Sequence, residues 1–159
     1  MRRAAPVLAL ALALASAAAT AQEPASAPKA EAARPEACRE ADASLGKAKE
    51  FLARKDDEGA LAAIEAAKKG CPEPTAEYFL VHGDVLAGLK RWNDAVMQYH
   101  EALRIKPACG DAANALARVF YLSRRYEQAK VVLRNAEAAG ATVDAELKKA
   151  VEAKLEKPK

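Results

Sequence analysis

Small residues along the chain recur with a period of 34 to 35 positions. Segments starting at Ala41, Ala76 and Gly110 each contain three small residues, at constant offsets of 12 and then 7. These nine residues are all alanine or glycine: Ala48, Ala60, Ala67, Gly83, Ala95, Ala102, Ala117, Ala129 and Ala136. A period of this length is typical of proteins that stack copies of one supersecondary unit.

Bulky apolar residues recur beside the small ones. Each segment has one bulky residue three positions after its first small residue and another four positions after its second: Phe51, Ile64, Leu86, Tyr99, Phe120 and Leu133. Two helices approach closely only where small side chains face each other, and bulky neighbours fill the space beside that contact. The pattern therefore predicts three helical hairpins, over residues 41–75, 76–109 and 110–143.

Polar stretches and caps complete the predicted elements. Lys55-Asp56-Asp57, Lys90-Arg91 and Arg124-Arg125 are expected to form the turns inside the hairpins. Gly140 suits the end of a helix, and Asp144 can cap a last helix over 144–156, whose apolar stripe is Leu147, Val151 and Leu155. Such a helix can seal the final hairpin of a stack, although a partner-binding amphipathic tail is the alternative.

Composition favours the same fold class. The chain has 159 residues, enough for one domain, and 42 of them are alanine, whereas Val, Ile and Thr together number only 14. Alanine is the best helix former and β-branched residues are preferred in strands. We therefore expect an all-α protein, an α-solenoid of three antiparallel helical hairpins plus a C-terminal capping helix, folded over residues 35–157.

The first 21 residues have the pattern of a secretory signal peptide. Arg2 and Arg3 precede a run of apolar residues, and Ala19 and Ala21 suit positions −3 and −1 of a cleavage site. Cleavage two residues earlier, or an uncleaved membrane anchor, are the alternatives. Residues 22–34 are rich in Pro, Ala and Glu and predict a flexible leader, after which Pro35 suits a first helical position. The predicted location is the periplasm, with full secretion left open.

Charge and reactive residues exclude several classes of function. Basic and acidic residues nearly balance after removal of residues 1–21 and are interspersed, so we expect no nucleic-acid binding, and no membrane insertion once the signal is cleaved. The spacing of two His and three Cys matches no metal site or redox motif, so we expect no metal, no cofactor and no catalytic residue. His82 is expected to be a half-buried packing residue and His100 to face outward. Trp92, Tyr99 and Tyr126 fall at hairpin-turn or packing positions and are expected to belong to the core, with ligand stacking as the alternative.

The repeats resemble the tetratricopeptide repeat over residues 41 to 143. The middle segment matches best, with Phe79-x₂-His82-Gly83-x₂-Leu86, then Ala95-x₃-Tyr99, then Ala102 and Pro107. The resemblance implies that the first helix of each hairpin lines a concave partner-binding groove. The groove positions it implies are Leu45, Lys49, Leu52, Leu80, Asp84, Ala87, Asn114, Arg118 and Tyr121.

These groove positions combine apolar and charged side chains, which suits an extended or helical peptide. The family's clamp for a C-terminal carboxylate is only partly represented, by Lys49, Asn114 and Arg118, and Asp84 opposes an anionic ligand. We expect a non-catalytic protein–protein interaction module of the bacterial cell envelope that binds a peptide or helix of a partner. The alternative is a structural, self-associating subunit of an envelope assembly complex, and a homo-oligomer remains possible.

Export makes disulfides possible. In stacked hairpins, the start of the first helix lies at the same end as the close of the second, so Cys38 and Cys71 are expected to pair. Cys71 with Cys109, one repeat later on the same edge, is the competing pair, and a fully reduced set of thiols is the third alternative.

Overall fold

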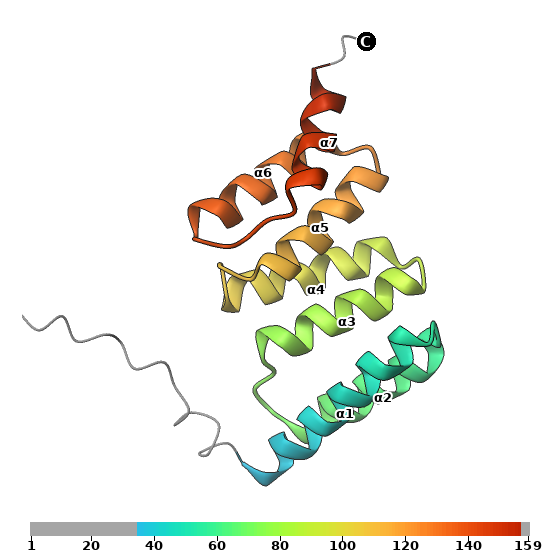
Figure 1. Cartoon of the computed structure of the whole chain (residues 1–159). Helices are drawn as coiled ribbons and strands as arrows, with labels where there is room; N and C mark the ends of the chain where they lie inside the picture. The colour runs from blue at the N-terminus through green and yellow to red at the C-terminus, as the bar shows by residue number, and fades with distance from the viewer. Residues whose placement is uncertain (1–34, 157–159) are drawn as a thin grey trace, which may run out of the picture. The chain divides into compact units, whose positions relative to one another are not determined.

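Within residues 35–156 the chain forms seven α-helices, of which the first six pack as three successive pairs (Figure 1). The computed structural model describes residues 35–156, apart from the side chain of Ala37. The predicted signal peptide 1–21, the leader 22–34 and residue 157 lie outside the described residues. The helices are α1 (Glu36–Ala53), α2 (Asp57–Gly70), α3 (Ala76–Gly88), α4 (Trp92–Ile105), α5 (Gly110–Leu122), α6 (Tyr126–Ala138) and α7 (Ala145–Leu155).

The pairing confirms the predicted fold class. Helix α1 lies antiparallel to α2, α3 to α4, and α5 to α6, while α7 packs against both α5 and α6 (Figure 1). Each pair therefore corresponds to one predicted hairpin. Pro35 precedes the first helical residue rather than occupying it, and its fixed φ of −53° leads directly into α1.

The nine repeated small residues are all buried. Gly83 shows why size matters at these positions, because a Cβ built on it would lie 2.5 Å from Cε1 of Tyr99. Five of the six bulky repeat residues are also buried, and Phe51 is half-buried. A small residue on one helix that leaves room for a bulky side chain of its partner, as Gly83 does for Tyr99, thus lets the two helices of the hairpin pack closely.

The turn inside each hairpin has the same backbone conformation. Lys55, Lys90 and Arg124 each have φ of +59°, the left-handed conformation that reverses the chain after a helix. Side chains cap the starts of α2 and α3: Asp56 accepts a hydrogen bond from the Gly59 N–H at 2.9 Å, and Thr75 accepts one from the Tyr78 N–H at 3.2 Å. These local signals fix where the helices end and begin.

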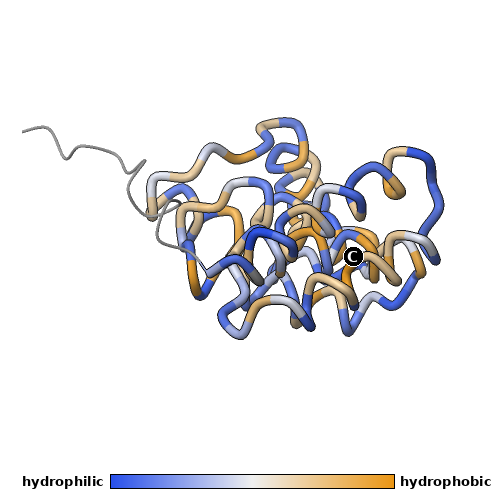
Figure 2. Tube along the Cα trace, turned by 90° about the horizontal axis from the view of Figure 1, so that it is seen from below, coloured by the Kyte–Doolittle hydropathy of each residue, from blue (hydrophilic) through white to orange (hydrophobic). Residues whose placement is uncertain are grey.

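The odd-numbered helices form a continuous layer. Helix α1 contacts α3, α3 contacts α5, and α5 contacts α7, whereas no two of α2, α4 and α6 contact each other within residues 35–156. Along each helix, hydrophobic segments alternate with hydrophilic ones (Figure 2). Side chains on the free side of α1, α3 and α5 therefore come together on one surface.

The structure contains the Cys38–Cys71 disulfide, which the sequence predicts as the first of three alternatives. It joins the start of α1 to the residue that follows α2, with the two Cα atoms 4.5 Å apart and both side chains buried. Cys109 is half-buried and has no disulfide. None of the helices within residues 35–156 combines the length and the apolar character needed to cross a membrane.

Candidate functional site

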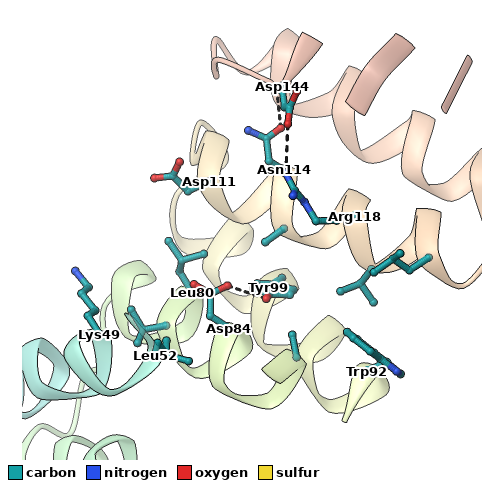
Figure 3. A pocket seen from close by; sticks show the side chains of 15 residues that line it. Lys49, Leu52, Leu80, Asp84, Trp92, Tyr99, Asp111, Asn114, Arg118 and Asp144 are labelled. Atoms are coloured by element: carbon teal, nitrogen blue, oxygen red, sulfur yellow. Dashed lines mark hydrogen bonds and ion pairs between the residues drawn. The ribbon is translucent and has the colours of Figure 1, made fainter. Parts of the chain in front are cut away.

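A groove of about 720 Å³ crosses the layer of odd-numbered helices (Figure 3). Its walls come from α1, α3 and α5, with two side chains from α4 and Asp144 from the segment before α7. Polar and apolar side chains both line it.

Seven of the nine predicted groove residues line this one cavity: Lys49, Leu52, Leu80, Asp84, Ala87, Asn114 and Arg118. They come from all three hairpins, so the fold brings together residues that lie far apart in the sequence. Their role in binding a partner stays a prediction.

The structure places the other two predicted groove residues elsewhere. Leu45 is only 5% exposed and belongs to the core between α1, α2 and α3, because its side chain leaves α1 on the face toward α2. Tyr121 is half-buried and packs edge-on against Tyr126, with ring centroids 5.5 Å apart. Both residues therefore support the helices and do not line the groove.

Eight further residues line the groove without having been predicted to: Val81, Trp92, Tyr99, Asp111, Ala115, Val119, Leu122 and Asp144. Asp111 and Leu122 continue the helical spacing of Asn114 and Arg118 along one face of α5, so the pattern of that helix contains a signal for them. Trp92 and Tyr99 come from α4, the second helix of its hairpin, and no pattern in the first helices points to them.

Trp92 corrects a sequence expectation. We expect this residue in the core, but it is the first residue of α4, it is 39% exposed, and it lines the groove. Leu122, at the end of α5, also lines the groove and is 63% exposed. These two side chains give one end of the groove an accessible apolar surface.

Tyr99 has a polar function at the groove as well as a packing one. Its ring is buried against Gly83, and its hydroxyl donates a hydrogen bond to Oδ1 of Asp84 at 2.8 Å (Figure 3). Burial raises the pKa of the Asp84 carboxyl, and the nearby charge of Asp111 raises it further, while the Tyr99 hydrogen bond opposes the shift. Burial and the Asp84 carboxylate in turn raise the pKa of Tyr99. Tyr99 is therefore a neutral donor that holds Asp84 in place.

Both basic side chains of the groove are already paired. Lys49 of α1 forms a salt bridge with Glu77 of α3. Arg118 of α5 forms one with Asp144 at 3.3 Å. The first salt bridge joins α1 to α3 and the second joins α5 to the segment before α7, so each basic side chain of the groove already has a carboxylate partner.

Asp144 also organises the C-terminal end of the site. Its carboxylate caps α7 by accepting hydrogen bonds from the N–H groups of Glu146 and Leu147, at 3.0 and 3.1 Å. Its own N–H donates to Oδ1 of Asn114 at 2.9 Å. The cap predicted for the last helix is confirmed, and Leu147 and Val151 are buried as part of the predicted apolar stripe.

The two histidines lie outside the groove. His82 is half-buried against Tyr78, with ring centroids 5.7 Å apart, and burial lowers its pKa, as do the charges of Lys68 and Arg91. His100 is exposed and lies beside Phe120. Both positions agree with the expectation that His82 packs and His100 faces outward.

No protein-family model matches this chain, and no curated protein matches its sequence.

Proposed function

We propose that the groove binds a segment of a partner protein and that the chain is a non-catalytic interaction module built from three tetratricopeptide-like repeats. The observation that carries this proposal is the groove itself, in which seven residues at the implied binding positions of successive repeats line one cavity. A groove of about 720 Å³ with apolar and charged walls is large enough to take several side chains of a peptide.

The accessible apolar end of the groove supports binding of protein rather than of a small polar solute. Trp92 and Leu122 are two of the five exposed large apolar residues among the described residues, and Leu122 is the most exposed of them. Aromatic residues in such positions are common anchors at protein interfaces, because they bury a large area with little loss of conformational freedom.

The repeat assignment is supported by the packing of the small residues. All nine are buried at the hairpin contacts, and the three turns share one backbone conformation. Repetition of side-chain size and of backbone geometry at the same period is what a tetratricopeptide stack requires.

We also propose that the protein acts in the bacterial periplasm. The support is the Cys38–Cys71 disulfide, since disulfides persist in oxidising compartments, together with the signal-peptide pattern of residues 1–21.

Capture from envelope extract with groove variants tests the proposal. Leu122→Glu places a charge on the apolar end of the groove, and Arg118→Glu reverses a charged wall. Matched controls are Val131→Glu, at an exposed apolar residue on α6, and Arg104→Glu, which also breaks an exposed salt bridge. None of these changes touches the buried helix contacts, so helical circular dichroism should stay unchanged.

The proposal predicts that both groove variants lose a captured partner that both controls keep. Retention of every partner by the two groove variants would contradict it. Sedimentation tests the self-associating alternative. If the chain self-associates through the groove, its apparent mass rises with protein concentration, and the groove variants have a lower apparent mass than the wild type.

A further inference from the structure

Two carboxylates in the groove lack a basic partner. Asp84 accepts its hydrogen bond from a neutral hydroxyl, and Asp111 stands exposed at the first turn of α5. Within residues 35–156, neither carboxylate takes part in a salt bridge. The charge of Asp111 acts on Asp84, so the two groups are close enough to repel each other.

The rest of the groove does not neutralise these two charges. Its lining includes two basic side chains, Lys49 and Arg118, and both already contact a carboxylate. Asp144, the third acid of the lining, is the partner of Arg118. The groove therefore has an excess of negative charge centred on Asp84 and Asp111.

Apolar side chains lie beside these carboxylates. Leu52 and Leu80 border the side of the groove that holds Asp84 and Asp111, and Trp92 lies at the opposite end (Figure 3). An arginine or lysine side chain has an apolar stem and a charged head, so it fits a surface on which leucines lead to carboxylates. An anionic ligand would be repelled by the two carboxylates that lack a salt bridge, and Lys49 and Arg118 already form salt bridges with other carboxylates.

We propose that the groove recognises a peptide segment of the partner that carries a cationic side chain, arginine or lysine, next to large apolar side chains. The cationic head lies between Asp84 and Asp111, its stem lies along Leu80, and a neighbouring apolar side chain packs on Trp92. This proposal rests on the proposed function, because it names the chemistry of the segment that the same groove binds. It departs from recognition of a C-terminal carboxylate, since the charge selected is the opposite one.

Peptide display followed by titration tests this charge preference. Random twelve-residue peptides displayed on phage are selected for binding to the purified protein. The best binder is then synthesised in its selected form and with its cationic residue replaced by glutamate. Where that residue is an arginine, a third peptide carries neutral citrulline in its place. Each peptide is titrated by fluorescence anisotropy against the wild type, Asp84→Asn, Asp111→Asn and the control Glu65→Gln. Asparagine keeps an oxygen that can accept the Tyr99 hydrogen bond, and Glu65 is an exposed carboxylate of α2 outside the groove.

We expect selected peptides to be enriched in arginine or lysine within a few positions of a large apolar residue. Asp84→Asn and Asp111→Asn should each lower the affinity for the cationic peptide by about fivefold or more, because each removes a charge-assisted contact. The same variants should change binding of the citrulline or glutamate peptide much less, and Glu65→Gln should bind like the wild type.

If the selected peptides are acidic or uncharged, and Leu122→Glu still abolishes their binding, the cation preference is overturned while the proposed function stays in place. Equal affinity of the cationic and citrulline peptides, or indifference to both asparagine variants, would do the same. Absence of any enriched peptide, together with partner capture that ignores Leu122→Glu, would overturn both proposals. If the protein forms a concentration-dependent dimer that Asp111→Asn disrupts, the occupant of the groove is a second copy of the chain, and the peptide proposal is overturned.

Discussion

The hydroxyl of Tyr99 donates a hydrogen bond to Asp84 at 2.8 Å, which joins α4 to α3 at the floor of the groove. The same tyrosine ring packs on Gly83, one position before Asp84. The middle hairpin thus uses one side chain both to close its helix contact and to orient a groove carboxylate. Stability and recognition are coupled at this pair.

The first prediction concerns the charge of Asp84. Burial and Asp111 raise the pKa of this carboxyl above its ordinary value of 3.8, so folding disfavours its ionised form. The folded protein therefore holds the Asp84 proton more tightly than the unfolded chain does. As pH rises from the ordinary pKa of the carboxyl through the raised one, the free energy of unfolding falls, and above the raised pKa it falls no further from this cause. Asp84→Asn removes the charge and keeps an acceptor for Tyr99, so the variant should melt at a higher temperature than the wild type at pH 7.

The pH dependence of that difference provides the check. Thermal unfolding followed by circular dichroism should show the advantage of Asp84→Asn shrinking as pH falls toward the ordinary pKa of an aspartate, about 4. Glu65→Gln, at an exposed carboxylate, should show no such trend. If Asp84→Asn raises the melting temperature equally at pH 7 and near pH 4, the ionised carboxylate is not the cause of the difference.

The second prediction concerns the contact between Gly83 and Tyr99. A Cβ at position 83 would lie 2.5 Å from Cε1 and 2.7 Å from Cδ1 of the Tyr99 ring. Because this buried ring has little room to move, Gly83→Ala should lower the free energy of unfolding by about 1–3 kcal/mol in urea denaturation. Gly46→Ala is the matched control: nothing lies within 4 Å of the added Cβ there. It should stabilise α1 by about 0.5–1 kcal/mol through helix propensity, and a loss as large as that of Gly83→Ala would argue against the steric explanation.

The third prediction concerns the disulfide of the first hairpin. Cys38 and Cys71 are 33 positions apart, and closing a loop of this length stabilises the folded state by about 4 kcal/mol on the chain-entropy model. The double variant Cys38→Ser/Cys71→Ser should therefore show faster amide hydrogen exchange in α1 and α2, with smaller changes in α5 and α6. Cys109→Ser serves as the control, because Cys109 has no disulfide, and it should leave exchange in α1 and α2 unchanged.

The fourth prediction concerns the left-handed residue in the hairpin turns. Lys90 is exposed and has φ of +59°, a conformation that costs a non-glycine residue about 1 kcal/mol. Lys90→Gly should raise the free energy of unfolding by about 0.5–1 kcal/mol, measured by chemical denaturation. Lys47→Gly, at an exposed lysine in the interior of helix α1, should lower it by a similar amount. A loss at position 90 would show that the lysine side chain contributes more than its backbone strain costs.

Much of the fold could be predicted from the sequence, because its determinants are local and repeated. The small residues at constant offsets located the helix contacts, and all nine of them are buried. Asp144 and the apolar residues after it identified the last helix, since a cap and a stripe act within one element. The Cys38–Cys71 pair was favoured over two alternatives because a hairpin places its two ends together, and the structure contains it.

The groove lining could be predicted only in part. Leu45 and Tyr121 were expected in the groove but pack elsewhere, while Trp92 was expected to pack but lines the groove. One position along a helix turns the side chain by about 100°, so a small rotation of a helix exchanges a groove residue for a core residue. The sequence by itself determined the three hairpins and the terminal cap, and it favoured the Cys38–Cys71 pair over two alternatives. Only the tertiary structure decided which faces of the helices meet, and with that the Tyr99–Asp84 pair within the middle hairpin and the two groove carboxylates without a salt bridge, because these depend on how each helix is rotated as it packs.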